Sequence, residues 1–362
     1  MKSAIVCLPF LLVIPVSCDD SPGGPGAWEV TPPENPLPAG NRLFGITVTE
    51  NEGGFLPSFD VARQAGLQVV EINIPWDSIE TGPGTYQDPY GGVLAATAFY
   101  GTEGVEVLLS LAVVNTVFSC VPSYLDSLPF SSPEVISACE EVLDFVMGSI
   151  PDNVTVTGIS IGNEIDLVLT SYDDWVDYIV FFSAVADYFR NAYPGIPVGG
   201  KCTVMNGVFG PDSLHVEALN EHSDIVMLTY YPQDGDFQVL PPETVHDHFS
   251  AICQTFPGKE IWLCEAGYQS GQDWCASSEE QQAEFFHELF TAWDDHAGQV
   301  GLIKIDWLHD ISPGMLAGLL EYYGFSDPGF VEYLATLGLR TYVGTDKYAW
   351  LQLLAETEAR GW

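Results

Sequence analysis

The chain has 362 residues, of which 50 are Asp or Glu and only 10 are Lys or Arg, so its formal net charge at pH 7 is −40. Such a chain repels nucleic acid, anionic membrane surfaces and strongly anionic polysaccharides, which excludes them as favourable partners. A hydrophobic content of 47% with 12% aromatic residues argues against a disordered chain, and the length suits one α/β barrel.

The N-terminal segment has the pattern of an export signal. Lys2 supplies a positive charge, and the apolar run after it is too short to span a bilayer as a stable anchor. The run 14–18 resembles a bacterial lipobox, which predicts a signal peptide at 1–17 and a lipid anchor on Cys18 as the only membrane contact. Ordinary secretion with cleavage nearby is the alternative. Residues 18–40 are rich in Pro, Gly and Asp and predict a disordered tether to an exported domain.

Export affects how the cysteines are interpreted, because an oxidising compartment permits disulfides. Beyond the N-terminal segment the chain has Cys120, Cys139, Cys202, Cys253, Cys264 and Cys275. The sequence leaves their connectivity open. We expect Cys120 and Cys139 to pair, because that bond would close a short loop leading into a helix. No pair has the spacing of a zinc site, and we expect no metal.

From residue 43 onward, strand and helix patterns alternate with short connections. The expected strands cover 43–48, 69–75, 105–114, 156–162, 198–204, 225–230, 260–264 and 302–308. The expected helices cover 59–66, 133–148, 172–192, 213–221, 241–256, 279–296 and 346–359. This alternation is typical of a parallel α/β fold. A closed (β/α)8 TIM barrel, formed by residues 41–362 as a single catalytic domain, is favoured over an open doubly wound sheet, because the chain has no Gly-rich dinucleotide or phosphate loop.

Polar and aromatic residues stand at the expected ends of these strands. In (β/α)8 barrels the working residues lie at the C-terminal ends of the strands. The predicted site therefore consists of Trp76, Asn115, Asn163, Glu164, Tyr230, Tyr231, Glu265, Trp307 and His309. Sugars have apolar C–H faces and hydroxyl edges, so aromatic surfaces with a few polar groups suit them. Core packing is the alternative for Trp76 and Trp307.

Two glutamates of this set end apolar runs about a hundred residues apart. Glu164 follows Gly-Ile-Ser-Ile-Gly-Asn, and Glu265 follows Glu-Ile-Trp-Leu-Cys. A carboxylate at the end of a buried strand is costly to desolvate unless it is paired or used. Glycoside hydrolysis needs such a pair, one acid that protonates the leaving oxygen and one carboxylate that attacks the anomeric carbon. In a retaining enzyme the two carboxyl groups lie about 5 Å apart, which is the spacing that we expect here.

These motifs resemble those of clan A, the large group of retaining β-glycosidases built on the (β/α)8 barrel, and the resemblance covers residue 43 to the C-terminus. In that clan the acid/base glutamate follows an asparagine at the end of the fourth strand, which matches Asn163 and Glu164. The nucleophile ends the seventh strand, which matches Glu265. The fold, the activity and the roles of these residues are what the resemblance implies.

The resemblance also implies substrate-binding residues. An aromatic hydroxyl after the sixth strand commonly contacts the nucleophile, which fits Tyr230 or Tyr231, and a tryptophan after the eighth strand often forms the floor of the cleavage subsite, which fits Trp307. Trp76 and Asn115 are further candidates for contact with the sugar.

The function that these residues predict is hydrolysis of a β-linked neutral glycan of β-glucan, galactan or mannan type, outside the cytoplasm and with retention of configuration. The motifs are similar to those of endo-β-1,4-galactanases and of β-glucanase-like families, and the substrate stays open. A non-catalytic surface glycan-binding lipoprotein on the same barrel is the alternative, against which the presence of both carboxylates argues. We expect a monomer that takes an oligo- or polysaccharide substrate and needs no cofactor.

Overall fold

The structure, a computed structural model, describes residues 28–362. The predicted signal peptide at 1–17, the lipid anchor on Cys18 and the first part of the predicted tether lie outside the described residues. Within the described range, no helix has the length and apolar character needed to cross a membrane.

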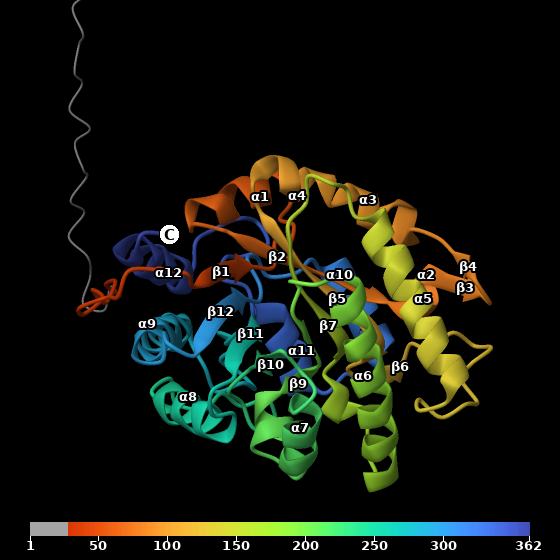
Figure 1. Ribbon diagram of the computed structural model, residues 1–362. Helices are drawn as coiled ribbons and strands as arrows, with labels where there is room; N and C mark the ends of the chain where they lie inside the picture. Colours follow the sequence, from red (N-terminus) through yellow and green to blue (C-terminus); the bar gives the residue numbers. More distant parts are fainter. Residues whose placement is uncertain (1–27) are drawn as a thin grey trace, which may run out of the picture.

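A closed ring of parallel strands forms the centre of the molecule (Figure 1). Its strands are β1 (Leu43–Ile46), β2 (Val69–Pro75), β5 (Glu106–Asn115), β7 (Val156–Asn163), β8 (Val198–Gly199), β9 (Lys201–Thr203), β10 (Ile225–Tyr230), β11 (Glu260–Ala266) and β12 (Val300–Ile305). The ring closes where β1 pairs with β12, with Leu43 opposite Leu302. The predicted (β/α)8 barrel is confirmed.

The fifth strand position is divided at Gly200 into β8 and β9. β8 pairs with β7, and β9 pairs with β10, so the two short pieces together join the halves of the barrel. The backbone approaches its neighbour closely here, because a Cβ on Gly199 would lie 2.6 Å from the carbonyl oxygen of Ile225. Glycines weaken a strand, and Gly199 and Gly200 lie where the single expected strand 198–204 is divided into two short ones.

Helices surround the barrel (Figure 1). The outer ring contains α1 (Phe55–Gln64), α4 (Ala98–Glu103), α5 (Pro133–Ser149), α6 (Tyr172–Ala192), α7 (Ser213–Asn220), α8 (Thr244–Thr255), α9 (Glu279–Asp295) and α12 (Tyr348–Arg360). Shorter elements in the connections are α2 (Trp76–Ile79), β3 (Glu80–Gly82), β4 (Thr85–Tyr86), η1 (Pro89–Gly91), α3 (Val93–Ala96), β6 (Phe118–Ser119), η2 (Ile165–Leu167) and η3 (Val204–Val208). The start of α9 is as predicted, because the Ser278 side chain accepts a hydrogen bond from the backbone N–H of Gln281.

Two helices that the sequence analysis did not assign follow β12. They are α10 (Pro313–Tyr323) and α11 (Pro328–Thr336), and each begins with a proline after a capping side chain, Ser312 or Asp327. Their apolar sides pack together around Phe330. Because they follow the last strand of the barrel, they lie over its C-terminal end, where sites form in this fold.

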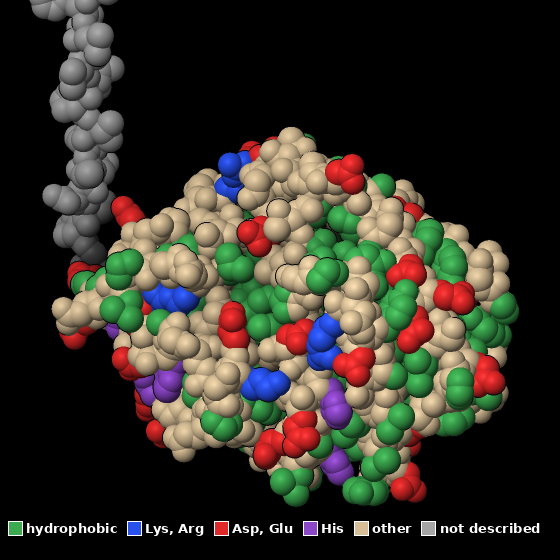
Figure 2. Space-filling model, viewed as in Figure 1, with side chains coloured by type: hydrophobic (Ala, Val, Ile, Leu, Met, Phe, Trp, Pro, Cys, Tyr) green, Lys and Arg blue, Asp and Glu red, His purple; other side chains and the backbone are tan. Residues whose placement is uncertain are grey.

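The charge of the chain is divided unequally between surface and interior. Five basic residues of the described chain are buried, namely Arg42, Lys201, Lys304, Lys347 and Arg360. The face seen in Figure 2 carries scattered acidic side chains and few Lys or Arg side chains. Four acidic residues of the described chain are buried as well, namely Glu80, Asp166, Asp306 and Glu356, so the acidic excess of the composition remains on the surface.

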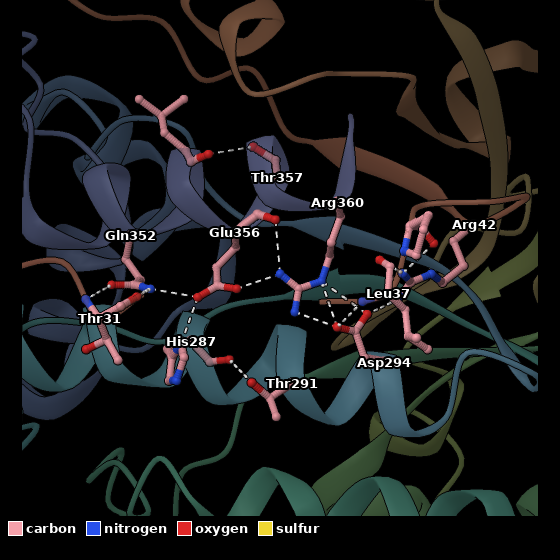
Figure 3. Close-up of polar contacts among 12 residues, drawn as sticks. Thr31, Leu37, Arg42, His287, Thr291, Asp294, Gln352, Glu356, Thr357 and Arg360 are labelled. Carbon is pink, nitrogen blue, oxygen red and sulfur yellow. Dashed lines mark hydrogen bonds and ion pairs between the residues drawn. The ribbon is translucent and has the colours of Figure 1, made fainter. Parts of the chain in front are cut away.

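Residues 28–40, which we name the N-terminal strap, correct the prediction of a disordered tether. The strap lies against α9 and α12 (Figure 3). The backbone N–H of Thr31 donates to Gln352 Oε1 at 2.9 Å, and Gln352 Nε2 donates back to the Thr31 carbonyl at 2.8 Å. The N–H of Leu37 donates to Asp294 Oδ2 at 3.1 Å. The tether prediction is wrong here because the partners that order the strap lie about 250 residues or more away in sequence.

The predicted disulfide is also absent, because Cys120 and Cys139 are both free and buried. The backbone of Cys120 is fixed after β6, where its N–H donates to the Val113 carbonyl and its carbonyl accepts from the Asp77 N–H, each at 2.9 Å. Cys139 lies in the second turn of α5, within the apolar layer between helix and barrel. Loop length was a poor guide, because it does not say where either side chain points.

Candidate active site

A cavity of about 950 Å³ opens at the C-terminal end of the barrel. Its walls come from the ends of β2, β5, β7, β9, β10, β11 and β12, and from α10 and α11. Six residues predicted from the sequence line it together, namely Asn115, Asn163, Glu164, Tyr231, Glu265 and Trp307. The predicted strand ends therefore meet at one cavity.

Glu164 follows β7 in the left-handed backbone region (φ 49°, ψ 51°), which residues other than glycine rarely adopt. Its carboxylate accepts hydrogen bonds from the hydroxyls of Thr116 at 2.8 Å and Thr229 at 2.9 Å. Both partners are neutral. Burial and the negative charge of Glu265 raise the pKa of Glu164 to about 7, and the two hydroxyls only partly oppose this. A carboxyl with this pKa can hold and donate a proton near neutral pH.

Glu265, at the end of β11, has charged surroundings. Its Oε1 accepts from Lys201 Nζ at 2.9 Å, and its Oε2 accepts from the Tyr231 hydroxyl at 2.9 Å. Burial alone would raise the pKa of Glu265, but Lys201 and Lys304 outweigh that effect and hold the pKa below its ordinary value. Glu265 is therefore kept as a carboxylate, the form that attacks as a nucleophile.

The two lysines belong to an ion network inside the barrel. Lys201 on β9 contacts Glu71 on β2 as well as Glu265, and Lys304 on β12 contacts Glu71 and Asp306. Burial would lower the pKa of each lysine, but the surrounding carboxylates raise it, so both lysines stay charged. Loss of either lysine would leave buried carboxylates facing one another. The network thus fixes both the position and the charge of Glu265.

Asn163 presents an unused acceptor at the cavity wall. Its Nδ2 donates to Asn115 Oδ1 at 2.7 Å. Its own Oδ1 is buried and has no hydrogen-bond partner among the described residues. A buried acceptor left in this state costs about 1–3 kcal/mol, which a hydroxyl group of a ligand would recover.

Aromatic side chains cover one side of the cavity. Trp307 follows β12 after a cis peptide bond with Asp306. Tyr323 on α10 and Tyr333 on α11 also line it, and the Tyr333 ring packs edge-on against Tyr231 with the centroids 5.7 Å apart. None of the lining residues in the described chain is Lys or Arg. The cavity therefore offers apolar faces and polar edges but no cation at its surface.

Tyr230, predicted as a contact of the nucleophile, lies outside the cavity. Its side chain is fully buried, and its hydroxyl makes a 2.8 Å hydrogen bond with His248 Nδ1 on α8. Successive strand residues point to opposite sides of the sheet, so only Tyr231 turns toward Glu265. Of the two tyrosines that the resemblance allowed, Tyr231 is the one in contact with Glu265.

Trp76 and His309 are also outside the cavity, and the predictions for them are wrong. The Trp76 indole is fully buried and donates to Glu80 Oε2 at 2.9 Å, so the core-packing alternative is correct. His309 is buried, with its Nδ1 3.0 Å from the Thr49 carbonyl. Each residue comes after a barrel strand, but its side chain contacts a neighbouring connection, at Glu80 for Trp76 and at Thr49 for His309.

Four residues that surround the two glutamates were not predicted from the sequence. Lys201 and Lys304 had a signal, because a lysine within an apolar strand pattern is unusual and this chain has only 10 basic residues. Thr116 and Thr229 had none, since threonine is an ordinary strand residue. Only the fold shows that their hydroxyls meet at one carboxylate.

No protein-family model and no curated protein sequence matches the chain. Its fold is nevertheless similar to that of solved glycoside hydrolases. GH5_18 from Streptomyces cattleya, solved in complex with GlcNAc, has a TM-score of 0.65 and 17% identity, with coverage of 90% of this chain and 80% of that chain.

Two further structures agree. GH5_18 from Bifidobacterium longum, in complex with Manb1-4GlcNAc, has a TM-score of 0.67 and 15% identity, covering 88% of this chain and 78% of that one. The exo-beta-1,4-mannosidase Op5Man5 from Opitutaceae bacterium strain TAV5 has a TM-score of 0.67 and 15% identity, with coverage of 88% of this chain and 59% of that chain. The chain therefore has the (β/α)8 fold of the glycoside hydrolases that its motifs resemble.

Proposed function

We propose that this protein is a retaining β-glycosidase, with Glu164 as acid/base and Glu265 as nucleophile. The observation that carries the proposal is the unequal setting of two carboxyls in one cavity. Glu164 has only neutral hydroxyl partners and a pKa of about 7, whereas Glu265 is paired with Lys201. Pairs of titratable groups whose pKa values are separated by their environments are typical of acid–base catalysis.

In the first step, a carboxylate oxygen of Glu265 attacks the anomeric carbon as the bond to the leaving oxygen breaks. Glu164 donates its proton to that oxygen, so the aglycone departs as a neutral alcohol and the glycone stays bound to Glu265 as an ester. The Tyr231 hydroxyl and Lys201 hold the nucleophile in place before the attack.

The second step reverses the role of Glu164, which now takes a proton from water as the water oxygen attacks the anomeric carbon. The bond between that carbon and the Glu265 oxygen breaks at the same time, so the free sugar and the Glu265 carboxylate are released. The structure supports this exchange. The negative charge of Glu265 is one cause of the raised pKa of Glu164, and ester formation removes that charge. Glu164 is therefore a better acid before the ester forms and a better base afterwards.

The substrate that fits best is a neutral β-linked sugar. The unpaired Oδ1 of Asn163 is suited to the 2-hydroxyl of the sugar under attack, and Trp307 offers an apolar face. The absence of Lys and Arg from the described cavity lining gives a uronic acid carboxylate no partner. The names of the similar structures make β-mannosides the first substrates to test, before β-glucosides and β-galactosides. The predicted export signal would place this activity outside the cytoplasm.

The decisive experiment combines a substrate panel with covalent trapping. Chromogenic β-mannosides, β-glucosides and β-galactosides are offered to the wild type, to Glu265→Gln and to Glu164→Gln. A 2-deoxy-2-fluoro sugar with an activated leaving group should then label the wild type, and peptide mass spectrometry should locate the label on Glu265. A label elsewhere overturns the assignment of the nucleophile. Saturable binding of β-glycans with no turnover of any substrate would support the non-catalytic glycan-binding alternative instead.

A further inference from the structure

We infer that the site acts on chain ends, because a contact between α10 and the β5–β6 turn closes the end of the cavity that holds the glycone. A single terminal sugar then fits beyond the bond to be cleaved. This inference rests on the proposed glycosidase function and adds the mode of action, release of one sugar at a time from a non-reducing end.

The closing contact, which we name the bridge, consists of Asn115, Phe118 and Tyr322. Asn115 Nδ2 donates to the Tyr322 hydroxyl at 3.0 Å. The Phe118 ring packs edge-on against the Tyr322 ring, with 5.0 Å between the centroids. The next residue on α10, Tyr323, lies against Thr116. Two segments about 200 residues apart in sequence are thus joined above the barrel.

The bridge closes the cavity on the side of the first and second strands, where the connections that follow these strands form no wall. It runs from the connection after the eighth strand to the connection after the third, and so passes the first and second strands. The described segments 47–68 and 76–105, which follow those two strands, contribute no residue to the cavity lining, and β2 itself contributes only Asn73. On this side the cavity therefore ends at the bridge.

The proposed chemistry identifies the closed end as the glycone end. C2 belongs to the same sugar ring as the carbon under attack, and its hydroxyl is the group suited to Asn163 Oδ1. Asn163 donates to Asn115, which in turn donates to Tyr322. The glycone therefore lies between the two glutamates and the bridge. The leaving sugar then lies on the opposite side of the cavity, which Leu167 and Asn206 line.

The bridge is one side chain thick, which makes it testable. Tyr322 is 39% exposed and Phe118 is 44% exposed, so solvent lies directly outside. A glycan that continued past the cleaved sugar would have to pass through these two rings. Removing the rings should open the end of the cavity without touching Glu164 or Glu265.

The test compares hydrolysis of one chromogenic β-oligosaccharide in two forms, with a free non-reducing end and with that end blocked by a 4,6-acetal. We expect the wild type to release single sugars from the free form and to act on the blocked form at least roughly 100-fold more slowly. The double variant Phe118→Ala, Tyr322→Ala should raise the blocked-to-free ratio about tenfold or more. Tyr322→Phe keeps the ring and Tyr172→Ala removes an exposed tyrosine on α6, and both should keep the wild-type ratio.

Internal cleavage of the blocked form by the wild type would overturn the inference, and so would an unchanged ratio in a folded double variant, as judged from its thermal melt. A wild type that hydrolyses no member of the substrate panel is a different result, because it contradicts the proposed glycosidase function itself.

Discussion

The surroundings of Glu164 and Glu265 differ most in the presence of cations. Both carboxyls end buried strands and both lose water, which raises the pKa of each. Around Glu164 only the hydroxyls of Thr116 and Thr229 oppose that rise, whereas Lys201 reverses it at Glu265. In the proposed mechanism, the position of a few buried charges, and not the glutamates themselves, thus decides which carboxyl is the acid and which is the nucleophile.

The largest expected effect tests the nucleophile half of this comparison. Glu265→Gln removes the attacking oxygen anion while keeping the shape of the side chain. Turnover of every active substrate should fall by at least about 10⁴-fold, whatever the leaving group. Steady-state rates on substrates with good and poor leaving groups measure this, and substantial activity with either kind would contradict the assigned role.

Loss of Glu164, the proposed acid/base, should affect the rates differently. Glu164→Ala should slow poor leaving groups by roughly 10²–10⁴-fold and affect activated ones much less in the first step, because these need no proton. Azide should restore part of the rate by attacking the glycosyl ester without a general base, and the product should be the β-glycosyl azide. If both variants lost the same activity and neither could be rescued, the two carboxyls would not have distinct roles.

Removing the cation tests the cause of the difference. Lys201→Met should leave Glu71 and Glu265 facing each other without their shared lysine, at a cost of about 3–5 kcal/mol in the free energy of unfolding. It should also raise the pKa of Glu265, so the acidic limb of the kcat/KM profile should move to higher pH. Lys259→Met is the matched control, because the one hydrogen bond of Lys259 Nζ within residues 28–362 is to the Ser223 carbonyl, at 2.7 Å. A variant with an unmoved acidic limb would show that Lys201 has no effect on the nucleophile.

A smaller shift is expected in the alkaline limb of the kcat/KM profile when a hydrogen bond to Glu164 is removed. In the proposed mechanism Glu164 must be protonated in the first step, and its pKa is about 7, so kcat/KM should fall as the pH rises through that value. The Thr229 hydroxyl stabilises the carboxylate and lowers the pKa of Glu164. Thr229→Val should therefore move the alkaline limb to higher pH and leave the acidic limb in place. A shift to lower pH would contradict the described hydrogen bond.

The smallest effect concerns the surface. A formal net charge of −40 causes self-repulsion, which salt screens over about 10 Å at 0.1 M. Thermal melts should therefore show a rising Tm from millimolar to several hundred millimolar NaCl. The pH limbs should move little, because the Lys201–Glu265 pair is buried and poorly screened. A flat or falling Tm would show that the acidic side chains are far enough apart not to matter.

The sequence was sufficient to predict the barrel and to place Glu164 and Glu265 at one cavity, because strand alternation and the positions of strand ends are local patterns. It was not sufficient to choose between Tyr230 and Tyr231, since the choice depends on where strand β10 ends. Thr116 and Thr229 could not be found either, because their shared role depends on two strands meeting across the barrel. The strap was missed for the same reason, since Gln352 and Asp294 are distant in sequence.

The pairing of β1 with β12 has a consequence for how the chain reaches its fold. Leu43 and Leu302 are opposite each other, so the ring cannot close until nearly the whole chain is available. Contacts of such sequence separation slow folding, because the entropy of a long loop is lost before they form. During synthesis, the edges of β1 and β11 would stay unpaired until β12 emerges, and these edges are the places where an incomplete chain would associate with others.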